Sequence, residues 1–125
     1  VSMFDGVGLY KRFPSVLSGP IYPEVADGWT SLVEDFLDEM EQASRSFKEG
    51  AILVTDIKEK FGAMRIYVEY HLRDEDIVDL EKIVSKYEKL SSRTCSYCGD
   101  EDHKMHERRG YWDVIICEEC FSKHS

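Results

Sequence analysis

Hydrophobic residues recur every three or four positions in the segment that begins at Trp29. They fall on one face of a helix: Trp29, Leu32, Val33, Phe36, Leu37 and Met40, continued by Ala43 and Phe47. Asp27 or Gly28 can cap the start of this helix, and Gly50 can stop it. The spacing therefore predicts an amphipathic helix that lays its apolar face on a core.

Two segments that follow have the pattern of strands. Residues 51–57 are rich in β-branched and apolar types. Residues 64–72 alternate strictly between apolar and polar, as a half-buried strand does, with Met64, Ile66, Val68, Tyr70 and Leu72 on one face. Residues 58–63 connect them, and Gly62 can supply the turn. We therefore predict an antiparallel hairpin.

A second amphipathic helix is predicted over residues 74–91. Asp74 or Asp76 can cap it, and its apolar face consists of Ile77, Leu80, Ile83, Val84, Tyr87 and Leu90. Two helices can then pack on one face of a small sheet, which makes residues 1–93 an α+β domain.

The N-terminal residues 1–28 have a different composition. They contain all three prolines and four of the eight glycines. This favours an irregular lead-in with short extended pieces. The segment has no continuous apolar stretch of the kind found in secretory signals, and no run in the chain has the roughly 20 apolar residues that a membrane helix needs. We expect a cytoplasmic protein without a membrane segment.

All four cysteines lie near the C-terminal end, in two matching pairs. Cys95 and Cys98 are separated by 18 residues from Cys117 and Cys120. This C-x2-C spacing is typical of zinc sites, in which each pair directs both thiolates at one ion. Gly99 allows the tight turn that follows such a pair. We predict a zinc-ribbon-like module over residues 94–125 that holds one structural zinc.

Other roles for the cysteines stay open from the sequence. Two disulfides would need an oxidising compartment. A redox Cys pair should open a helix after a strand, whereas the first pair is followed by a loop-like sequence. A histidine could also replace a cysteine as ligand; the candidates are His103, His106 and His124.

The formal net charge of −9 disfavours binding to nucleic acid, because no segment is strongly basic. The polar side of the first predicted helix carries five acids: Glu34, Asp35, Asp38, Glu39 and Glu41. They form either a solvated face or a docking surface for a partner protein that has a basic surface.

A basic and aromatic spot surrounds the predicted hairpin turn. It consists of Lys58, Lys60 and Arg65 with Phe61 and Tyr67. These cations are candidate contacts for a phosphate, a small ligand or an acidic partner. The alternative is a charged hairpin tip with Phe61 in the core. His71, two residues from Glu69 on one strand face, is a candidate acid–base group or a plain surface residue.

Arg108, Arg109 and Tyr111 suggest a further alternative, a zinc ribbon that binds nucleic acid or assists transcription. Acidic neighbours in the same loop dilute its positive charge. We found no nucleophile elbow, phosphate-binding glycine loop or HExxH motif in the chain. The sequence therefore favours a non-enzymatic protein.

Several of these motifs together resemble a set of small, mostly uncharacterised proteins from bacterial, phage and prophage genomes. The matching positions span about residues 22–120 and are Tyr22, Pro23, Gly28, Trp29, the run Lys58–Gly62, Arg65, Tyr67 and the four cysteines. Ala63-Met64 stands here where Gly-Leu is commoner in that set. The resemblance implies a phage or prophage accessory protein and no particular activity. In that setting we expect a protein that binds a host protein, for example an inhibitor of host defence whose carboxylates stand in for phosphates.

Overall fold

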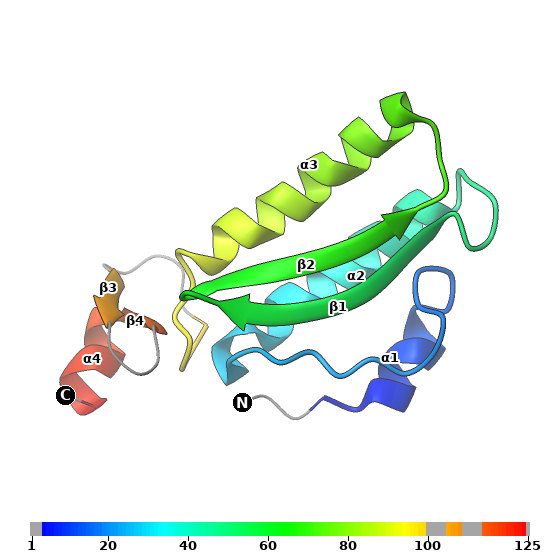
Figure 1. Ribbon diagram of the computed structural model, residues 1–125. Helices are drawn as coiled ribbons and strands as arrows, with labels where there is room; N and C mark the ends of the chain where they lie inside the picture. The colour runs from blue at the N-terminus through cyan, green and yellow to red at the C-terminus, as the bar shows by residue number, and fades with distance from the viewer. Residues whose placement is uncertain (1–3, 100–104, 109–113, 125) are drawn as a thin grey trace.

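The computed structural model describes residues 4–99, 105–108 and 114–124. Figure 1 shows the order of the elements along the chain. They are α1 (Gly6–Arg12), the 3-10 turn η1 (Asp27–Trp29), α2 (Thr30–Ser44), β1 (Ile52–Lys60), β2 (Ala63–Tyr70), α3 (Asp74–Ser91), β3 (Met105–Arg108), β4 (Val114–Cys117) and α4 (Glu118–His124). The class is α+β, as the sequence predicts.

The β1–β2 hairpin is antiparallel and forms one sheet by itself. Its register runs from Ile52 opposite Tyr70 to Lys60 opposite Ala63, with an irregularity between Val54 and Asp56. The turn has only two residues, because β1 continues to Lys60 instead of ending before the predicted connection. Gly62 supplies the turn as expected, with a φ of 80°.

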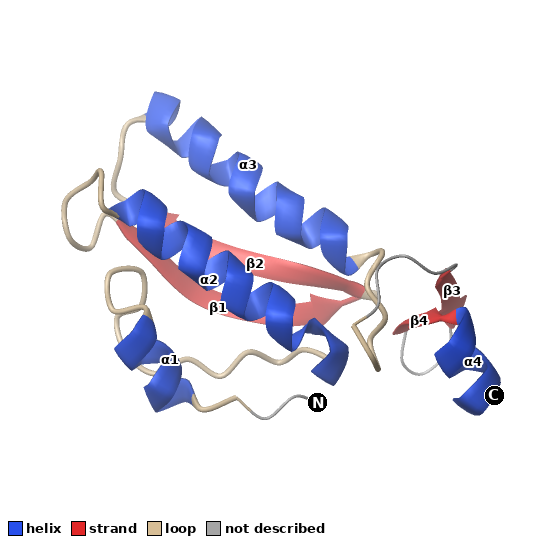
Figure 2. Ribbon diagram, turned by 180° about the vertical axis from the view of Figure 1, so that it is seen from behind, coloured by secondary structure: helices blue, strands red, loops and turns tan. Residues whose placement is uncertain are grey.

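Helices α2 and α3 lie side by side on the same face of this hairpin, α2 over the strands and α3 beside β2 (Figures 1 and 2). One core of buried residues joins them to the sheet, and its fully buried members include Trp29, Phe36, Leu37, Met40, Ile57 and Met64. Helix α3 also protects the edge of β2. The Ser91 hydroxyl accepts a hydrogen bond from the Met64 backbone N–H at 2.9 Å, and Glu88 accepts one from Ile66 at 3.0 Å.

The N-terminal segment contains a helix that the sequence analysis missed. Helix α1 begins after Asp5, whose side chain accepts a hydrogen bond from the Gly8 backbone N–H at 3.0 Å. Leu9 of α1 and Phe13 after it are buried in the core, which offsets the weak helix propensity of two glycines. Further on, Glu24 forms a parallel bridge with Lys58 and extends the β1 edge, which confirms a short extended piece.

The helix ends differ from the sequence prediction in detail. Trp29 and Arg73 occupy the N-cap positions of α2 and α3, and neither makes a side-chain cap bond, so the predicted aspartate caps are wrong. Asp74 and Asp76 instead lie in the first turn of α3, where the helix dipole favours negative charge. Helix α2 ends at Ser44, and Phe47 packs on the core from the turn that follows. In the part of the chain that the structure describes, no helix is long and apolar enough to span a membrane.

Candidate metal centre

The first cysteine pair lies in a tight backbone turn directly after α3. The Cys95 sulfur accepts hydrogen bonds from the backbone N–H groups of Tyr97 and Cys98, at 3.4 and 3.5 Å. Gly99 closes the turn by donating to the Cys95 carbonyl at 3.0 Å, and its φ is +79°. The turn that the sequence predicts from Gly99 is therefore confirmed.

The second pair lies where a strand ends and a helix begins. Cys117 is the last residue of β4, which pairs with β3, and Cys120 lies in the first turn of α4. Helix α4 is not predicted from the sequence. A strand-to-helix junction is also where a redox Cys pair would lie.

The fold brings both pairs to one point. The four sulfur atoms all lie within 4.8 Å of one another, and Cys98 Sγ is 3.7 Å from Cys117 Sγ. Sulfurs at about 2.3 Å from a tetrahedral zinc ion are about 3.8 Å apart, so this separation matches one edge of such a site. The cluster could hold one metal ion, and soft thiolates suit zinc or iron.

No disulfide joins the four cysteines in the structure. Their arrangement also distinguishes a metal site from a redox pair. A redox pair works with its own two sulfurs, whereas here Cys98 of the first pair approaches Cys117 of the second. The set is complete with sulfur alone, so no histidine is needed as a fourth ligand.

The cluster perturbs its own ionisation. Burial raises the pKa of Cys95, but backbone N–H groups of Cys117, Cys98 and Tyr97 outweigh it and lower that pKa to about 6. Burial and the neighbouring sulfurs raise the pKa of Cys120 well above its usual range. A thiolate is thus favoured at Cys95, and a bound cation would favour the ionised form of Cys120 as well.

The cluster is attached to the α+β domain through the residues at the start of α2. Gly28 donates its backbone N–H to the Ser96 carbonyl at 2.8 Å, and the Trp29 indole donates to the Thr94 carbonyl at 2.9 Å. Any Cβ on Gly28 would overlap the Cys95 carbonyl oxygen and lie 2.9 Å from the Gly99 nitrogen. Sequence reasoning missed this role of Gly28, and the Gly-Trp pair before the helix is the signal that could have revealed it.

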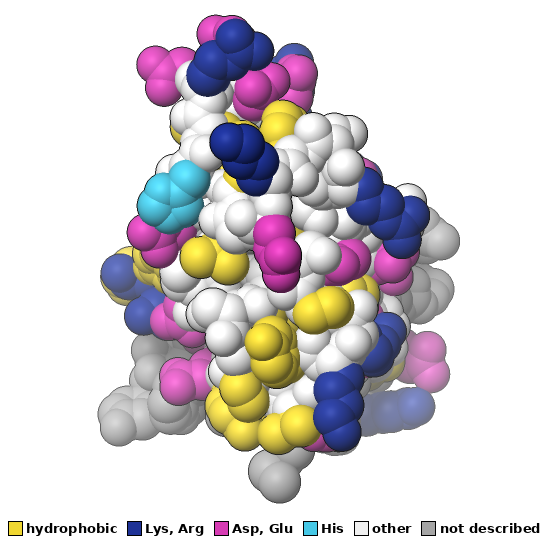
Figure 3. All heavy atoms as spheres, turned by 90° about the vertical axis from the view of Figure 1, so that its right-hand side faces the viewer, with side chains coloured by type: hydrophobic (Ala, Val, Ile, Leu, Met, Phe, Trp, Pro, Cys, Tyr) yellow, Lys and Arg dark blue, Asp and Glu magenta, His cyan; other side chains and the backbone are white. Residues whose placement is uncertain are grey.

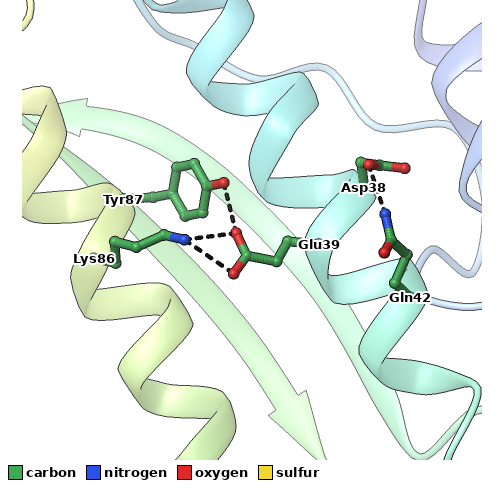
Figure 4. Close-up of polar contacts among 5 residues, drawn as sticks. All are labelled: Asp38, Glu39, Gln42, Lys86 and Tyr87. Atoms are coloured by element: carbon green, nitrogen blue, oxygen red, sulfur yellow. Dashed lines mark hydrogen bonds and ion pairs between the residues drawn. The ribbon is translucent and has the colours of Figure 1, made fainter.

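The acidic side chains of α2 do not form one free surface. Glu39 points toward α3, where Lys86 donates to both its carboxylate oxygens at 2.9 Å and the Tyr87 hydroxyl donates at 2.6 Å (Figure 4). Hydrogen bonds from Lys86 and then Tyr87 lower the pKa of Glu39. Glu39 therefore joins the two helices instead of facing a partner.

The other acids of α2 point in other directions. Glu34 pairs with Arg12 at 3.3 Å, and Glu41 accepts the Ser15 backbone N–H at 3.0 Å. Asp35 and Asp38 are exposed, and Asp38 also accepts a hydrogen bond from Gln42 at 2.9 Å. On the face seen in Figure 3, acidic and basic side chains are interspersed. The predicted acidic surface is thus reduced to Asp35 and Asp38.

The basic hairpin residues stay together on the sheet face that the helices leave open. Lys58 lies directly opposite Arg65 in the strand register, and Lys60 follows on β1. The prediction that places Phe61 in the core is wrong, because Phe61 is 78% exposed. It occupies the turn itself, beyond the last strand pair, and so it cannot reach the core.

His71 lies just after β2, and its Nε2 is 3.3 Å from a Glu69 carboxylate oxygen with both side chains exposed, as in a surface pair. Of the zinc-loop residues, Arg109 and Tyr111 lie outside the described residues, and Arg108 is described only as part of β3.

The chain matches no protein-family model, no curated protein and no solved structure.

Proposed function

We propose that this protein is a non-enzymatic, zinc-stabilised interaction protein that acts by binding another protein. The observation that supports a structural ion is the closed set of four sulfurs within 4.8 Å. A catalytic zinc keeps one coordination position open for water or substrate, and four thiolates fill all positions of a tetrahedral site. The ion would then join the two cysteine pairs, and through Cys95 it would hold them on the buried core.

The partner in this proposal is a host protein with a basic surface, and the protein comes from a phage or prophage. The phage setting rests on the resemblance of the sequence motifs. The net charge of −9 supports a basic partner, because it favours long-range attraction to positive surfaces and disfavours nucleic acid. Asp35 and Asp38 are the acids of α2 that remain exposed for such contact. An inhibitor of a defence protein is one form that such binding would take.

Affinity capture from a bacterial lysate tests the proposal. The wild-type protein is immobilised beside the Asp35→Lys/Asp38→Lys variant, and bound proteins are identified by mass spectrometry. The control is Glu75→Lys/Asp79→Lys, which makes the same charge change at exposed positions of α3. We expect a basic protein retained by the wild type and the control and lost from the α2 variant. The purified pair should then form a complex in solution.

An enrichment of the same proteins on all three baits would refute the role of Asp35 and Asp38. If the zinc-loaded protein turned over a small-molecule substrate, the hypothesis that it is not an enzyme would be refuted.

A further inference from the structure

The tip of the β1–β2 hairpin has a backbone conformation that its sequence does not favour. Phe61 and Gly62 both have positive φ, 55° and 80°, as in the two-residue turns that join tightly twisted strands. Asparagine and glycine suit the first of these positions, whereas a phenylalanine side chain is strained there. The turn does not need the ring, because the Gly62 backbone N–H is bound by the Glu59 carboxylate at 3.2 Å.

The Phe61 ring also gains nothing from burial. It is 78% exposed, the most of the large hydrophobic side chains that the structure describes. The strained backbone at Phe61 is therefore unfavourable in the unbound protein, because burial of the ring does not offset it. Exposed aromatic side chains with this property are typical anchors of protein interfaces, where a partner covers them.

The cations beside the tip are arranged in an equally unfavourable way. Lys58 and Arg65 face each other across the strands, and like charges in that position repel. Lys58 is partly compensated by Asp56 at 3.5 Å and by the Tyr67 ring, whose centroid is 5.3 Å from its ammonium nitrogen. Neither Lys60 nor Arg65 is paired with a carboxylate among the described residues.

These features lie on one open surface. Helices α2 and α3 cover the opposite side of the sheet, as Figures 1 and 2 show. Tyr67, which is 41% exposed, lies two residues from Arg65 on the same strand face. We define the hairpin surface as Lys58, Lys60, Phe61, Arg65 and Tyr67.

We propose that the hairpin surface binds an acidic segment of a partner protein, with carboxylates on Lys60 and Arg65 and an apolar side chain on the exposed Phe61 ring. This deepens the proposed function and rests on it, because it presumes a protein partner and specifies a second contact surface. Charge complementarity is the reason for proposing an acidic segment as the binding partner of this surface. Arg65 can bind a carboxylate with two parallel hydrogen bonds, and the partner's charge would relieve the repulsion between Lys58 and Arg65.

A nucleic acid fits this surface less well than a protein segment. Glu24 adjoins Lys58, Asp56 faces Tyr67, and Glu69 lies beyond Tyr67 on the same strand face. A continuous phosphate backbone would meet these carboxylates, whereas a short acidic segment can place its charges between them.

The test begins with a random peptide display library, selected against the full-length, metal-loaded protein. We expect the selected peptides to be rich in Asp and Glu and to carry a large apolar residue. A fluorescein-labelled selected peptide then serves as the probe for fluorescence anisotropy.

Phe61→Asn is the decisive variant, because asparagine suits the left-handed turn. It should leave the thermal midpoint equal or higher while it raises the Kd of the probe by about tenfold or more. Lys60→Glu/Arg65→Glu should weaken binding at least as much. The control Lys48→Glu/Lys82→Glu reverses two exposed charges elsewhere, and it should change the Kd by less than about twofold.

Four outcomes would overturn the inference. The first is a selection without acidic peptides, and the second is binding that Phe61→Asn leaves unchanged. The third is equal dependence on the same variants when the probe is labelled single-stranded DNA, which would assign the surface to nucleic acid. The fourth is a dimer of the protein that these variants dissociate, which would assign the surface to a second copy of the chain.

The capture experiment separates this inference from the proposed function. A lysate protein that depends on Asp35 and Asp38 but is still retained by the hairpin variants would keep the proposed function and remove the hairpin surface. A lysate in which no protein depends on either surface would remove both.

Discussion

The buried indole of Trp29 donates a hydrogen bond to the carbonyl oxygen of Thr94 at 2.9 Å. Trp29 lies at the start of α2 and Thr94 directly precedes the first metal-ligand candidate, Cys95. Both residues are fully buried, so this contact joins the cysteine cluster to the core of the α+β domain. Loss of the metal should therefore disturb the core around Trp29, and disruption of this part of the core should weaken metal binding.

The first prediction follows from this contact. In a Trp112→Phe variant, Trp29 is the only tryptophan, and removal of the ion by a strong chelator should shift its fluorescence toward that of a solvated indole. The reason is that the two cysteine pairs, no longer joined by the ion, would separate and loosen the turn that Trp29 binds. Restoring zinc should restore the spectrum. A chelated protein that keeps the buried Trp29 emission would contradict the coupling.

A substitution at Gly28 gives a second test of the same junction, with the metal left in place. Gly28→Ala places a methyl group against the backbone of residues 95–99, and backbone cannot move aside as a flexible side chain can. We expect it to lower the free energy of unfolding by at least about 2 kcal/mol and to weaken zinc retention. Chemical denaturation and competition with a chromogenic chelator measure the two effects.

The matched control for that substitution is Gly19→Ala, because a Cβ built there has no heavy atom within 4 Å apart from those of Gly19 and its two neighbours in the chain. It should be nearly neutral or slightly stabilising. Equal effects of the two substitutions would show that the close approach at Gly28 is unimportant.

The sequence predicts most of the central domain because its signals are periodic and local. The apolar spacing from Trp29 to Met40 specifies α2, strict alternation specifies β2, and α3 spans residues 74–91 as predicted. The cysteine spacing likewise predicts that the four sulfurs meet, because two C-x2-C pairs at this separation are typical of one shared zinc ion.

The remaining features depend on contacts between distant residues, which periodicity does not reveal. Helix α1 is hidden because Gly6 and Gly8 lower its local propensity, while the burial of Leu9 stabilises it. The partners of Glu39 lie on α3, far away in the sequence, and the helical pattern of α2 alone therefore predicts an exposed acid. Phe61 looks like a core residue until the register places it in the turn.

The third prediction concerns the contact between α2 and α3. The pKa of Glu39 is lower in the folded protein than its ordinary value of 4.5, so its contacts with Lys86 and Tyr87 stabilise the fold above that pH. This stabilisation is lost as the pH falls through the folded pKa. Glu39→Gln should therefore lower the free energy of unfolding by about 1 kcal/mol at neutral pH and by less in acid.

The comparison of the two proteins across pH isolates Glu39, because they differ at that position alone. The control Asp79→Asn removes an exposed carboxylate that pairs with Lys82 and should have a smaller effect. If the wild type were more stable than Glu39→Gln by the same free energy of unfolding at acid pH as at neutral pH, the stabilising role of the ionised Glu39 would be contradicted.

The fourth prediction concerns the edge of β2. Ser91→Ala removes the hydroxyl that accepts the Met64 backbone N–H, and both residues are fully buried. A buried N–H without a partner should lower the free energy of unfolding by about 1–3 kcal/mol. Hydrogen exchange should accelerate at the Met64 amide more than at the Val54 amide, which bonds to the Val16 carbonyl.

Ser92→Ala serves as the neighbouring control, because the Ser92 hydroxyl is exposed and bonds only to the Lys89 carbonyl at 2.7 Å. Its effect should stay within about 0.5 kcal/mol. Similar losses from Ser91 and Ser92 would mean that Ser91 does not protect the strand edge.

Native mass spectrometry of the protein, purified without added metal, tests the central claim most directly. The account predicts one zinc ion per chain, bound with the loss of thiol protons, and complete release of the ion when Cys95 and Cys117 are both replaced by serine. A metal-free chain would contradict it, whether the four cysteines are found as two disulfides or as free thiols in a fully folded protein.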